Sequence, residues 1–351
     1  DRRQRQMCIR DSASRLDRKI MIRLVKGAYW DAEVKRAQVL GLDGFPVFTR
    51  KQSTDVSYIA NARKLLQLTD RIYPQFATHN AHTVAAVLHM AEDMGRSPFD
   101  YEFQRLHGMG ERLHDIVLTD HSTRCRIYAP VGAHRDLLAY LVRRLLENGA
   151  NSSFVNQIVD EDVPPATVAA CPLTYVEGLA TIPSPALPTG PMLFVPRKNS
   201  RGWDLTDAAA LAGIEAARTP HMTTPFDAHP ILAGRAVGGP RQPVLNPATG
   251  DLVGHFLTAS EPDVQTALRL AEPWSAAAHE RAKVLTRAAD RLEDDHGRIF
   301  ALLAREAGKT LPDAVAELRE AVDFLRYYGA QADQPHPARG LFACISPWNF
   351  P

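Results

Sequence analysis

Four short apolar runs alternate with amphipathic stretches in the first part of the chain, and this alternation constrains the fold more than any other feature. The expected strands are residues 21–27, 75–78, 101–106 and 126–129. The expected helices are residues 31–40, 56–68, 81–94, 111–118 and 133–148, with an extra segment at 41–54. The last three strands begin about 25 residues apart, which is the spacing of a βα repeat and predicts a parallel sheet.

Polar residues gather where these strands end. They are Lys26, Thr78, His79, Asn80, Gln104, Arg105 and Tyr128. Four βα units make either half of a (βα)8 barrel or a small open sheet, and both architectures build ligand sites at the carboxyl ends of parallel strands. The pattern favours the barrel only modestly, so both architectures remain open at this point.

A proline-dense run at residues 183–196 cannot hold a helix or a central strand, and it predicts a linker or an extended segment. We place the first domain at residues 19–180, the linker at 181–243 and a second domain from residue 244 onward. The second domain is expected to begin with a hairpin at 244–257 that turns at 247–250.

Helical periodicity follows the hairpin at residues 261–271, 278–307 and 312–328, and Gly308 marks a break between the last two. The apolar run 341–345 reads as a strand that lacks a partner, so we expect the chain to be an internal fragment. Residues 1–18 are very polar and basic, and 5–12 resemble translated adapter sequence. We therefore expect 1–18 to be non-native.

Composition excludes several classes of protein. The formal net charge is +1, with 41 basic and 40 acidic residues, so the segment lacks the basic surplus of nucleic-acid-binding domains. The four cysteines are far apart and form no C-x-x-C pair, which argues against a disulfide framework or a zinc site and favours a reducing cytoplasm. The sequence has neither an apolar run long enough to span a bilayer nor a secretory signal.

The helix expected at residues 133–148 carries a distinctive polar pattern. Tyr140, Arg144 and Glu147 recur at helical spacing, and Arg143 lies four residues before Glu147. The functional interpretation is a clamp in which two guanidinium groups hold a carboxylate while the tyrosine closes over it. The alternative is a solvated helix face with an Arg143–Glu147 ion pair, and spacing alone slightly favours this alternative.

Other candidate sites are less specific. In residues 21–30, Arg23 and Lys26 precede a Gly-Ala pair and two aromatic residues, which suits a ligand-binding strand end but equally suits cations at a rim. His79 alone is typical of a helix N-cap or of a core histidine whose hydrogen bonds are satisfied. Thr49-Arg50-Lys51 offers two positive charges suited to phosphates, but such a segment is more typically solvent-facing. The sequence contains no G-x-G-x-x-G loop, no Walker motif, no metal-ligand spacing and no G-x-S-x-G elbow.

Several motifs together resemble one known family. Residues 23–30 (RLVKGAYW), 76–80 (FATHN), 128–132 (YAPVG) and 138–151 (LAYLVRRLLENGAN) closely resemble the proline dehydrogenase domain of bacterial proline utilization A. Residues 305–310 (REAGKT), 317–328 and 346–351 (SPWNFP) resemble the start of the aldehyde dehydrogenase domain of the same family. The first likeness runs almost continuously over residues 20–158.

The resemblance implies an FAD-binding (βα)8 barrel that removes a hydride from L-proline. By position, Arg143 and Arg144 hold the proline carboxylate, Glu147 orients an arginine, and Tyr29, Tyr128 and Tyr140 wall the pocket. Arg23 lies near the flavin N5 edge. The remaining flavin contacts implied by the resemblance are Val25, Gly27, Ala28, Trp30, Thr49, Arg50, Lys51, Thr54, Thr78, His79, Asn80, Gln104, Ser153 and Phe154.

The resemblance also implies a second reaction and further partners. The aldehyde dehydrogenase domain uses NAD to oxidise glutamate semialdehyde to glutamate, and Trp348 and Asn349 match its aldehyde-lining and oxyanion-donating positions. A membrane quinone reoxidises the flavin, and the family likeness separately implies a cytoplasmic homo-oligomer that associates peripherally with the inner membrane.

The chain departs from the family pattern in two ways. Only four of the eight barrel strands are recognised, and Cys344 does not occupy the position of the catalytic nucleophile. The fragment alone is therefore expected to be inactive. The competing hypotheses are a non-catalytic interaction protein and a parent with an added DNA-binding repressor role.

Overall fold

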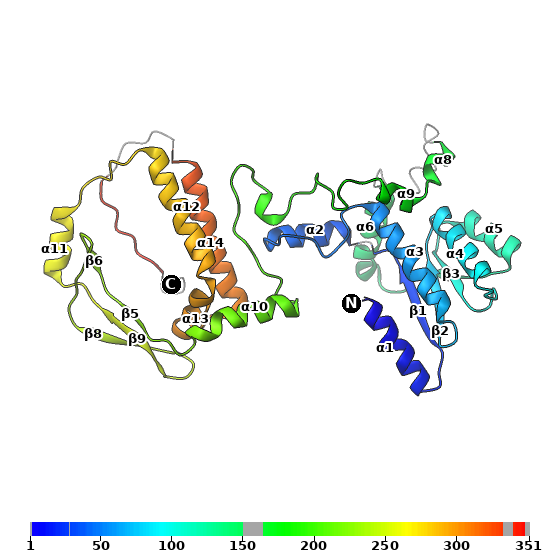
Figure 1. The fold of residues 1–351 in the computed structure, drawn as a ribbon, viewed down its shortest axis with the longest axis horizontal. Coiled ribbons are helices and arrows are strands. Elements are labelled where there is room, and N and C mark those ends of the chain that lie inside the picture. Colours follow the sequence, from blue (N-terminus) through cyan, green and yellow to red (C-terminus); the bar gives the residue numbers. More distant parts are fainter. Residues whose placement is uncertain (1, 28, 150–163, 333–339, 348–351) are drawn as a thin grey trace. The chain divides into compact units, whose positions relative to one another are not determined.

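The structure is a computed structural model that describes residues 2–27, 29–149, 164–332 and 340–347. The side chains of residues 2–7 and 143–149, and those of Pro165 and Val168, are not described. The chain divides into two compact units, one of Asp1–Glu33 with Val47–Leu187 and one of Val34–Pro46 with Pro188–Pro351 (Figure 1).

The first unit is built on a parallel sheet. Its strands, in sheet order, are β1 (Ile20–Val25), β2 (Ile72–Ala77), β3 (Glu102–Leu106) and β4 (Arg124–Tyr128). Strands that follow one another in the sequence are neighbours in the sheet, so the winding never reverses as it does in a doubly wound sheet. This sequential order is that of a barrel-type βα fold and resolves the choice left open above in favour of the barrel.

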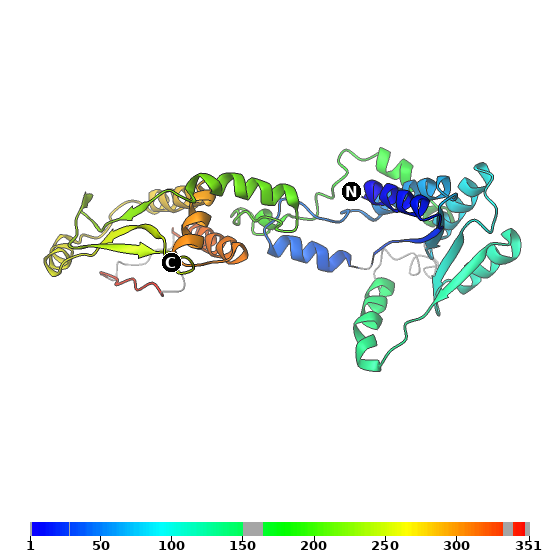
Figure 2. The same ribbon diagram turned by 90° about the horizontal axis from the view of Figure 1, so that it is seen from below.

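Helices follow or precede each strand of this unit, as Figure 2 shows for the segments around the sheet. They are α1 (Arg2–Arg15), α2 (Trp30–Val39), α3 (Lys51–Gln67), α4 (Ala81–Asp93), α5 (Glu111–His121), α6 (His134–Gly149), α8 (Pro165–Val168) and α9 (Pro172–Glu177). The end of α2 belongs with the second unit.

One face of the sheet forms the hydrophobic core of the first unit. Phe76 and Phe103 are fully buried there, and they pack in one cluster with Leu65 of α3 and with Val84 and Val87 of α4. Side chains alternate between the faces of a strand, so the neighbouring residues Gln75, Glu102 and Gln104 lie on the opposite face. The apolar residues fix which face the helices cover, and the polar residues are left for the other face.

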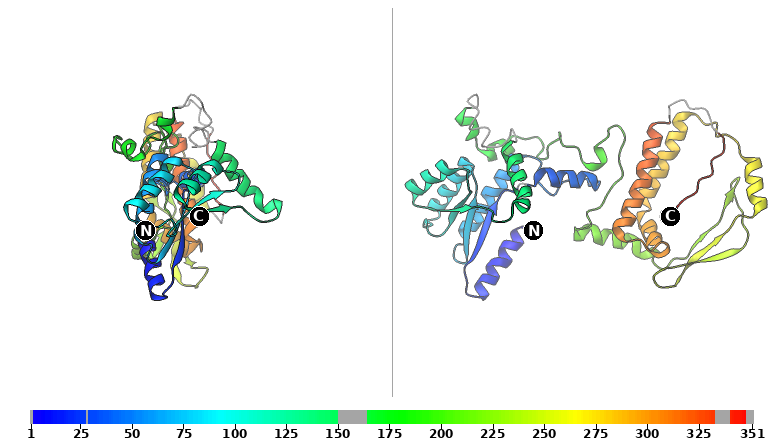
Figure 3. Two further views of the ribbon diagram at one scale, coloured as in Figure 1. Left: turned by 90° about the vertical axis from the view of Figure 1, so that its right-hand side faces the viewer. Right: turned by 180° about the vertical axis from the view of Figure 1, so that it is seen from behind.

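The second unit combines a helical bundle with small sheets. The bundle contains α10 (Ala208–Arg218), α12 (Ala278–Asp294), α13 (His296–Glu306) and α14 (Leu311–Ala330), and Figure 3 shows α12 and α14 side by side. Its core includes Trp203, Ile214, Phe300, Leu318 and Val322. The remaining elements are η1 (Gly190–Met192), η2 (Thr219–His221), β5 (Phe226–Ala228), β6 (Ile231–Leu232), β7 (Arg235–Ala236), β8 (Arg241–Leu245), β9 (Leu252–Leu257) and α11 (Glu261–Leu270).

The predicted hairpin is confirmed, because β8 and β9 pair antiparallel around residues 246–251. A third strand, β5, pairs with β9 in parallel. Gly308 has a φ of +64° and separates α13 from α14, as predicted. The helix expected at 278–307 is in fact two helices, α12 and α13, which are interrupted at Asp295.

Two further expectations differ from the structure. Residues 341–345 form no strand, and Leu341, Phe342 and Ile345 are exposed. An apolar run cannot form a strand without a partner for its backbone, so the strand prediction is wrong for this chain. The range expected to be a linker contains α10, whose Ile214 is buried in the core of the second unit.

Candidate functional site

The candidate site lies on the polar face and at the carboxyl edge of the four-stranded sheet. The strand register aligns Arg23 with Gln75, Gln75 with Glu102, and Glu102 with Arg124. These four residues therefore form one row across the sheet, on the face opposite to the Phe76 core. Charged and amide side chains in such a row need hydrogen-bonding partners or a polar ligand.

Glu102 is the centre of a hydrogen-bonded network on this face. Its carboxylate accepts from Arg126 Nε at 2.5 Å and Nη2 at 3.2 Å, and from Gln75 Nε2 at 2.5 Å. Tyr73 also donates to it at 3.4 Å. Burial opposes ionisation of Glu102, but the bonds from Arg126 and Gln75 outweigh it and hold the pKa of this carboxyl below its ordinary value. The polar face is thus held together by an ionised, multiply bonded carboxylate.

Three predicted site residues converge at the end of β4. The guanidinium of Arg23 lies 5.4 Å from the ring centre of Tyr128, within the range of a cation–π contact. The rings of Tyr128 and Tyr140 are 6.4 Å apart, centre to centre. Tyr140 comes from α6, so the arginine helix is brought beside the arginine of β1. A cation and two phenols in this arrangement can line a small pocket for an anionic or aromatic ligand.

Lys26 occupies the carboxyl end of β1 and is bonded to two helices. Its ammonium forms an ion pair with Asp55 of α3 and donates to Thr83 Oγ1 of α4 at 3.3 Å. It also lies 5.3 Å from the ring centre of Tyr58. Burial lowers the pKa of Lys26, and the charge of Asp55 acts in the opposite direction. Lys26 is therefore not a loose rim cation but part of a buried cluster.

Two histidines tie the end of β2 to its surroundings, His79 to β3 and His114 to α5. His79 Nε2 accepts from the backbone N–H of Leu106 at 3.1 Å, and His114 Nε2 bonds the carbonyl oxygen of Thr78 at 3.0 Å. His114 is buried, and burial lowers the pKa of its imidazole. The ring of His79 also faces Gly110, whose φ of +64° allows the chain to turn there without a side chain. These contacts fix the edge that carries Thr78 and His79.

Unsatisfied polar atoms test whether these residues fit a polar cofactor. The side-chain oxygen of Gln104 is buried and accepts no hydrogen bond, although Gln104 is only 4% exposed. Ser53 Oγ is also buried without a partner, within the segment predicted to reach the cofactor's phosphates. Most buried polar atoms in native proteins have partners, and Gln104 lies on the polar face, so its open acceptor fits a polar ligand there.

Other predicted contacts are engaged within the chain. Trp30 donates its indole N–H to the carbonyl oxygen of Phe48 at 2.8 Å. Arg50 Nε donates to the carbonyl oxygen of Ile182 at 3.0 Å, and Thr49 Oγ1 accepts from the backbone of Ser184 at 2.8 Å. The segment after α9 therefore covers part of the region predicted to reach the phosphates. Asn80 caps α4 by accepting from the backbone of Thr83 at 2.9 Å.

The remaining predicted residues are exposed or lie outside the description. Val25, Gly27, Tyr29 and Lys51 are exposed, and Thr54 is half-buried. Ala28, Ser153, Phe154, Trp348 and Asn349 lie outside the described residues, as do the side chains of Arg143, Arg144 and Glu147. The backbone of α6 confirms the helix that carries the paired arginines. The binding of a carboxylate by these arginines stays a prediction.

Several residues of the site were not singled out from the sequence. They are Asp55, Tyr58, Thr83, Glu102, His114 and Arg126. A charged residue second in the strand expected at 101–106 is a usable signal for Glu102. Asp55 and Thr83 carry no such signal, because only the folded chain brings them to Lys26.

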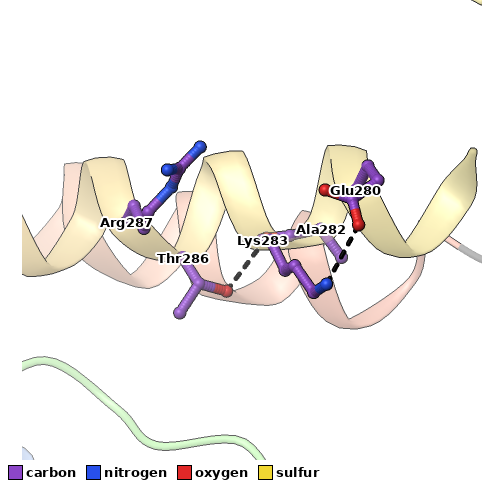
Figure 4. A pocket seen from close by; sticks show the side chains of 5 residues that line it. All are labelled: Glu280, Ala282, Lys283, Thr286 and Arg287. Atoms are coloured by element: carbon purple, nitrogen blue, oxygen red, sulfur yellow. Dashed lines mark hydrogen bonds and ion pairs between the residues drawn. The ribbon is translucent and has the colours of Figure 1, made fainter. Parts of the chain in front are cut away.

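A search of the described ranges finds no cluster of histidine, cysteine or carboxylate side chains that could hold a metal ion. None of the described helices is long and apolar enough to span a membrane. A shallow hollow on α12 is lined by Glu280, Lys283, Thr286 and Arg287 (Figure 4). Lys283 and Glu280 bond each other at 2.9 Å, so this hollow is a solvated helix face.

Two family models match the chain. The proline dehydrogenase model matches residues 1–157, and the aldehyde dehydrogenase family model matches residues 236–351. The first match includes residues 1–18, whose origin stays a prediction.

Curated relatives and solved structures agree with the family models. The chain is 50% identical to bifunctional protein PutA of Salmonella typhimurium, over 97% of this chain and 28% of that protein, and 48% identical to PutA of Escherichia coli with the same coverage. A crystal structure of a Bradyrhizobium japonicum proline utilization A mutant is similar with a TM-score of 0.75 and 46% identity, over 91% of this chain and 30% of that chain. The chain thus spans about 28% of the length of these curated relatives.

Proposed function

Because the chain belongs to the family of bifunctional proline utilization A proteins, we propose that it supplies part of a flavoenzyme that oxidises L-proline. The observation that carries this proposal is the convergence of Arg23, Tyr128 and Tyr140 at the carboxyl edge of the sheet, beside motifs shared with the family. The buried, unpartnered oxygen of Gln104 on the same face supports a polar cofactor there.

In this proposal the substrate binds between α6 and the strand ends. Arg143 and Arg144 hold the carboxylate of proline, Glu147 orients one of these guanidinium groups, and Tyr29, Tyr128 and Tyr140 wall the ring. A planar guanidinium can donate two parallel hydrogen bonds to a carboxylate, so a pair of arginines fixes both position and orientation. The tyrosine rings exclude water from the reacting carbon.

FAD would bind beside this substrate site. Residues 23–30, 49–54, 78–80 and 104, with 153–154, are the proposed contacts. When bound, FAD would supply the redox chemistry as the hydride acceptor for C5 of proline. The guanidinium of Arg23 is suited to stabilise negative charge on the reduced flavin. The chain's own residues thus bind, orient and desolvate the two reactants.

The product of this oxidation, pyrroline-5-carboxylate, hydrolyses to glutamate semialdehyde. We assign the second unit to the start of the domain that oxidises this aldehyde with NAD, in which Trp348 lines the aldehyde and Asn349 donates to its oxyanion. The proposed acceptor of the flavin's electrons is a membrane quinone. A cytoplasmic homo-oligomer that associates peripherally with the inner membrane suits that acceptor.

The test uses the full-length protein that contains this segment. The purified protein is expected to carry FAD, and L-proline added without an electron acceptor is expected to bleach the visible absorption band of the oxidised flavin. D-proline serves as a control for specificity. A flavin that does not respond to L-proline, or a full-length protein that binds no flavin, contradicts the proposal.

A further inference from the structure

The Lys26 cluster joins three segments that the family resemblance assigns to cofactor binding. We define this cluster as Lys26, Asp55, Tyr58, Thr83 and Asn80. We propose that Lys26 is a positioning residue. Its ammonium holds residues 27–30, 49–54 and 78–80 in fixed positions relative to one another. This inference rests on the proposed flavin site and names a residue that determines its shape.

The connectivity of the cluster is the first support. Lys26 directly precedes residues 27–30, and its partner Asp55 directly follows residues 49–54. On its other side Lys26 donates to Thr83 Oγ1 at 3.3 Å, and Thr83 Oγ1 donates to Asn80 Oδ1 at 3.2 Å. One ammonium therefore links, through two hydrogen-bonded steps at most, the ends of all three segments.

Tyr58 extends the cluster into the backbone of the sheet. Its hydroxyl lies 3.2 Å from the carbonyl oxygens of both Leu24 and Ala77, and it donates to one or shares its hydrogen between them. These two carbonyls belong to the carboxyl ends of β1 and β2. The ring of Tyr58 faces the ammonium of Lys26, so the same side chain holds the strand ends and the cation.

Burial makes this arrangement different from a surface ion pair. Tyr58 and Thr83 are almost fully buried, and the side chains of Lys26 and Asp55 are only 25% and 12% exposed. An exposed pair is screened by water and restrains the chain little. A desolvated pair restrains the chain more strongly, because separating its partners leaves an uncompensated charge in a poorly solvated place. The cluster is therefore suited to fix geometry.

The residues that flank Lys26 in the sequence are exposed to solvent. Val25 and Tyr29, one residue before and three after Lys26, are more than half exposed. Neither side chain belongs to the hydrophobic core cluster of this unit, so Lys26 is the nearest buried anchor beside them in the sequence. A segment that must present backbone and aromatic groups to a ligand gains affinity when it is held in the bound shape beforehand.

The experiment compares Lys26→Met, Thr83→Val and the control Arg71→Met in the full-length protein. Arg71 directly precedes β2, at the amino edge of the sheet away from Lys26, and its side chain is 34% exposed, so its loss tests an ordinary surface cation of the same unit. Each apoprotein is reconstituted with FAD. The dissociation constant, the circular dichroism of the bound flavin and the melting temperature of the apoprotein are measured.

We expect Lys26→Met to weaken FAD binding roughly tenfold or more and to change the flavin dichroism. Thr83→Val keeps the shape of the side chain but removes its hydroxyl, so we expect weaker FAD binding with little change in the apoprotein's melting temperature. Arg71→Met is expected to bind FAD as the wild type does.

The outcomes separate this inference from the proposed function. A wild-type protein that binds no FAD contradicts the proposed function itself. A wild type that binds FAD, together with Lys26→Met and Thr83→Val proteins that bind it equally well and with the same dichroism, overturns the role of Lys26. If Lys26→Met does not fold, unchanged FAD binding by Thr83→Val alone overturns it.

Discussion

Arg126 of β4 holds the carboxylate of Glu102 of β3 through two nitrogens, at 2.5 and 3.2 Å. The two residues are not direct partners in the strand register, because Glu102 pairs with Arg124 and Gln104 with Arg126. The bond therefore runs diagonally across the polar face. It ties the last strand of the sheet to β3 and, through Gln75, to β2. The proposed site therefore lies on a face where the carboxylate of Glu102 joins β2, β3 and β4 through hydrogen bonds.

Replacing Glu102 by Gln is expected to destabilise the protein at neutral pH and much less in acid. The folded-state pKa of Glu102 is lowered from 4.5, so its contribution to stability is present above that value and is lost as the pH falls through the folded-state pKa. The urea midpoints of wild type and Glu102→Gln, measured at pH 7 and at acidic pH, test this. Midpoints that differ equally at both pH values contradict the assignment.

His114 predicts a second, separate loss of stability in mild acid. In the folded protein, burial lowers the pKa of His114 below its ordinary value of 6.5. Between pH 6.5 and the lowered pKa, this imidazole therefore binds a proton in the unfolded chain but not in the folded chain. Stability is therefore present above pH 6.5 and falls as the pH drops through the folded-state pKa. His114→Gln is expected to be less stable at pH 7 but to show a shallower decline towards pH 5, measured by urea unfolding. His89→Gln, at an exposed histidine, is the control, and an equally shallow decline in that control counts against His114.

Replacing Arg326 tests which ion pairs stabilise the second unit. Its guanidinium is only 6% exposed and bonds Glu293, Asp290 and the carbonyl oxygen of Asn199. Arg326→Met leaves the poorly solvated Glu293 carboxylate without its main partner, which costs roughly 3–5 kcal/mol of unfolding free energy. The exposed pair Arg298–Asp295 is the control, and Arg298→Met is expected to cost at most about 1 kcal/mol. Denaturant unfolding that gives equal losses for both variants refutes this ranking.

The sequence predicts those features that depend on local pattern. Alternating apolar runs locate β1 to β4, but the helix cap considered at His79 lies one residue later, at Asn80. The start of α3 was placed five residues late, at 56 instead of Lys51, because Arg50 provides no side-chain cap to mark it. The partners of Lys26 could not be predicted, because Asp55 and Thr83 are 29 and 57 residues away and meet it only through the packing of α3 and α4. Long-range pairs of this kind depend on the fold rather than on spacing.

The last prediction concerns the paired arginines of α6. In the full-length protein, Arg144→Met is expected to raise the Michaelis constant for L-proline about tenfold to a hundredfold, because a charge-assisted bond to a carboxylate is worth roughly 1.5–3 kcal/mol. The melting temperature is expected to stay the same, since the lost bond is made to the substrate and not to the fold. Arg135→Met is the matched control on the same helix, because Arg135 is exposed and pairs only loosely with Asp136 at 3.5 Å. If proline dependence is unchanged in Arg144→Met, or is altered equally in Arg135→Met, then α6 presents a solvated face and the carboxylate of proline is held elsewhere.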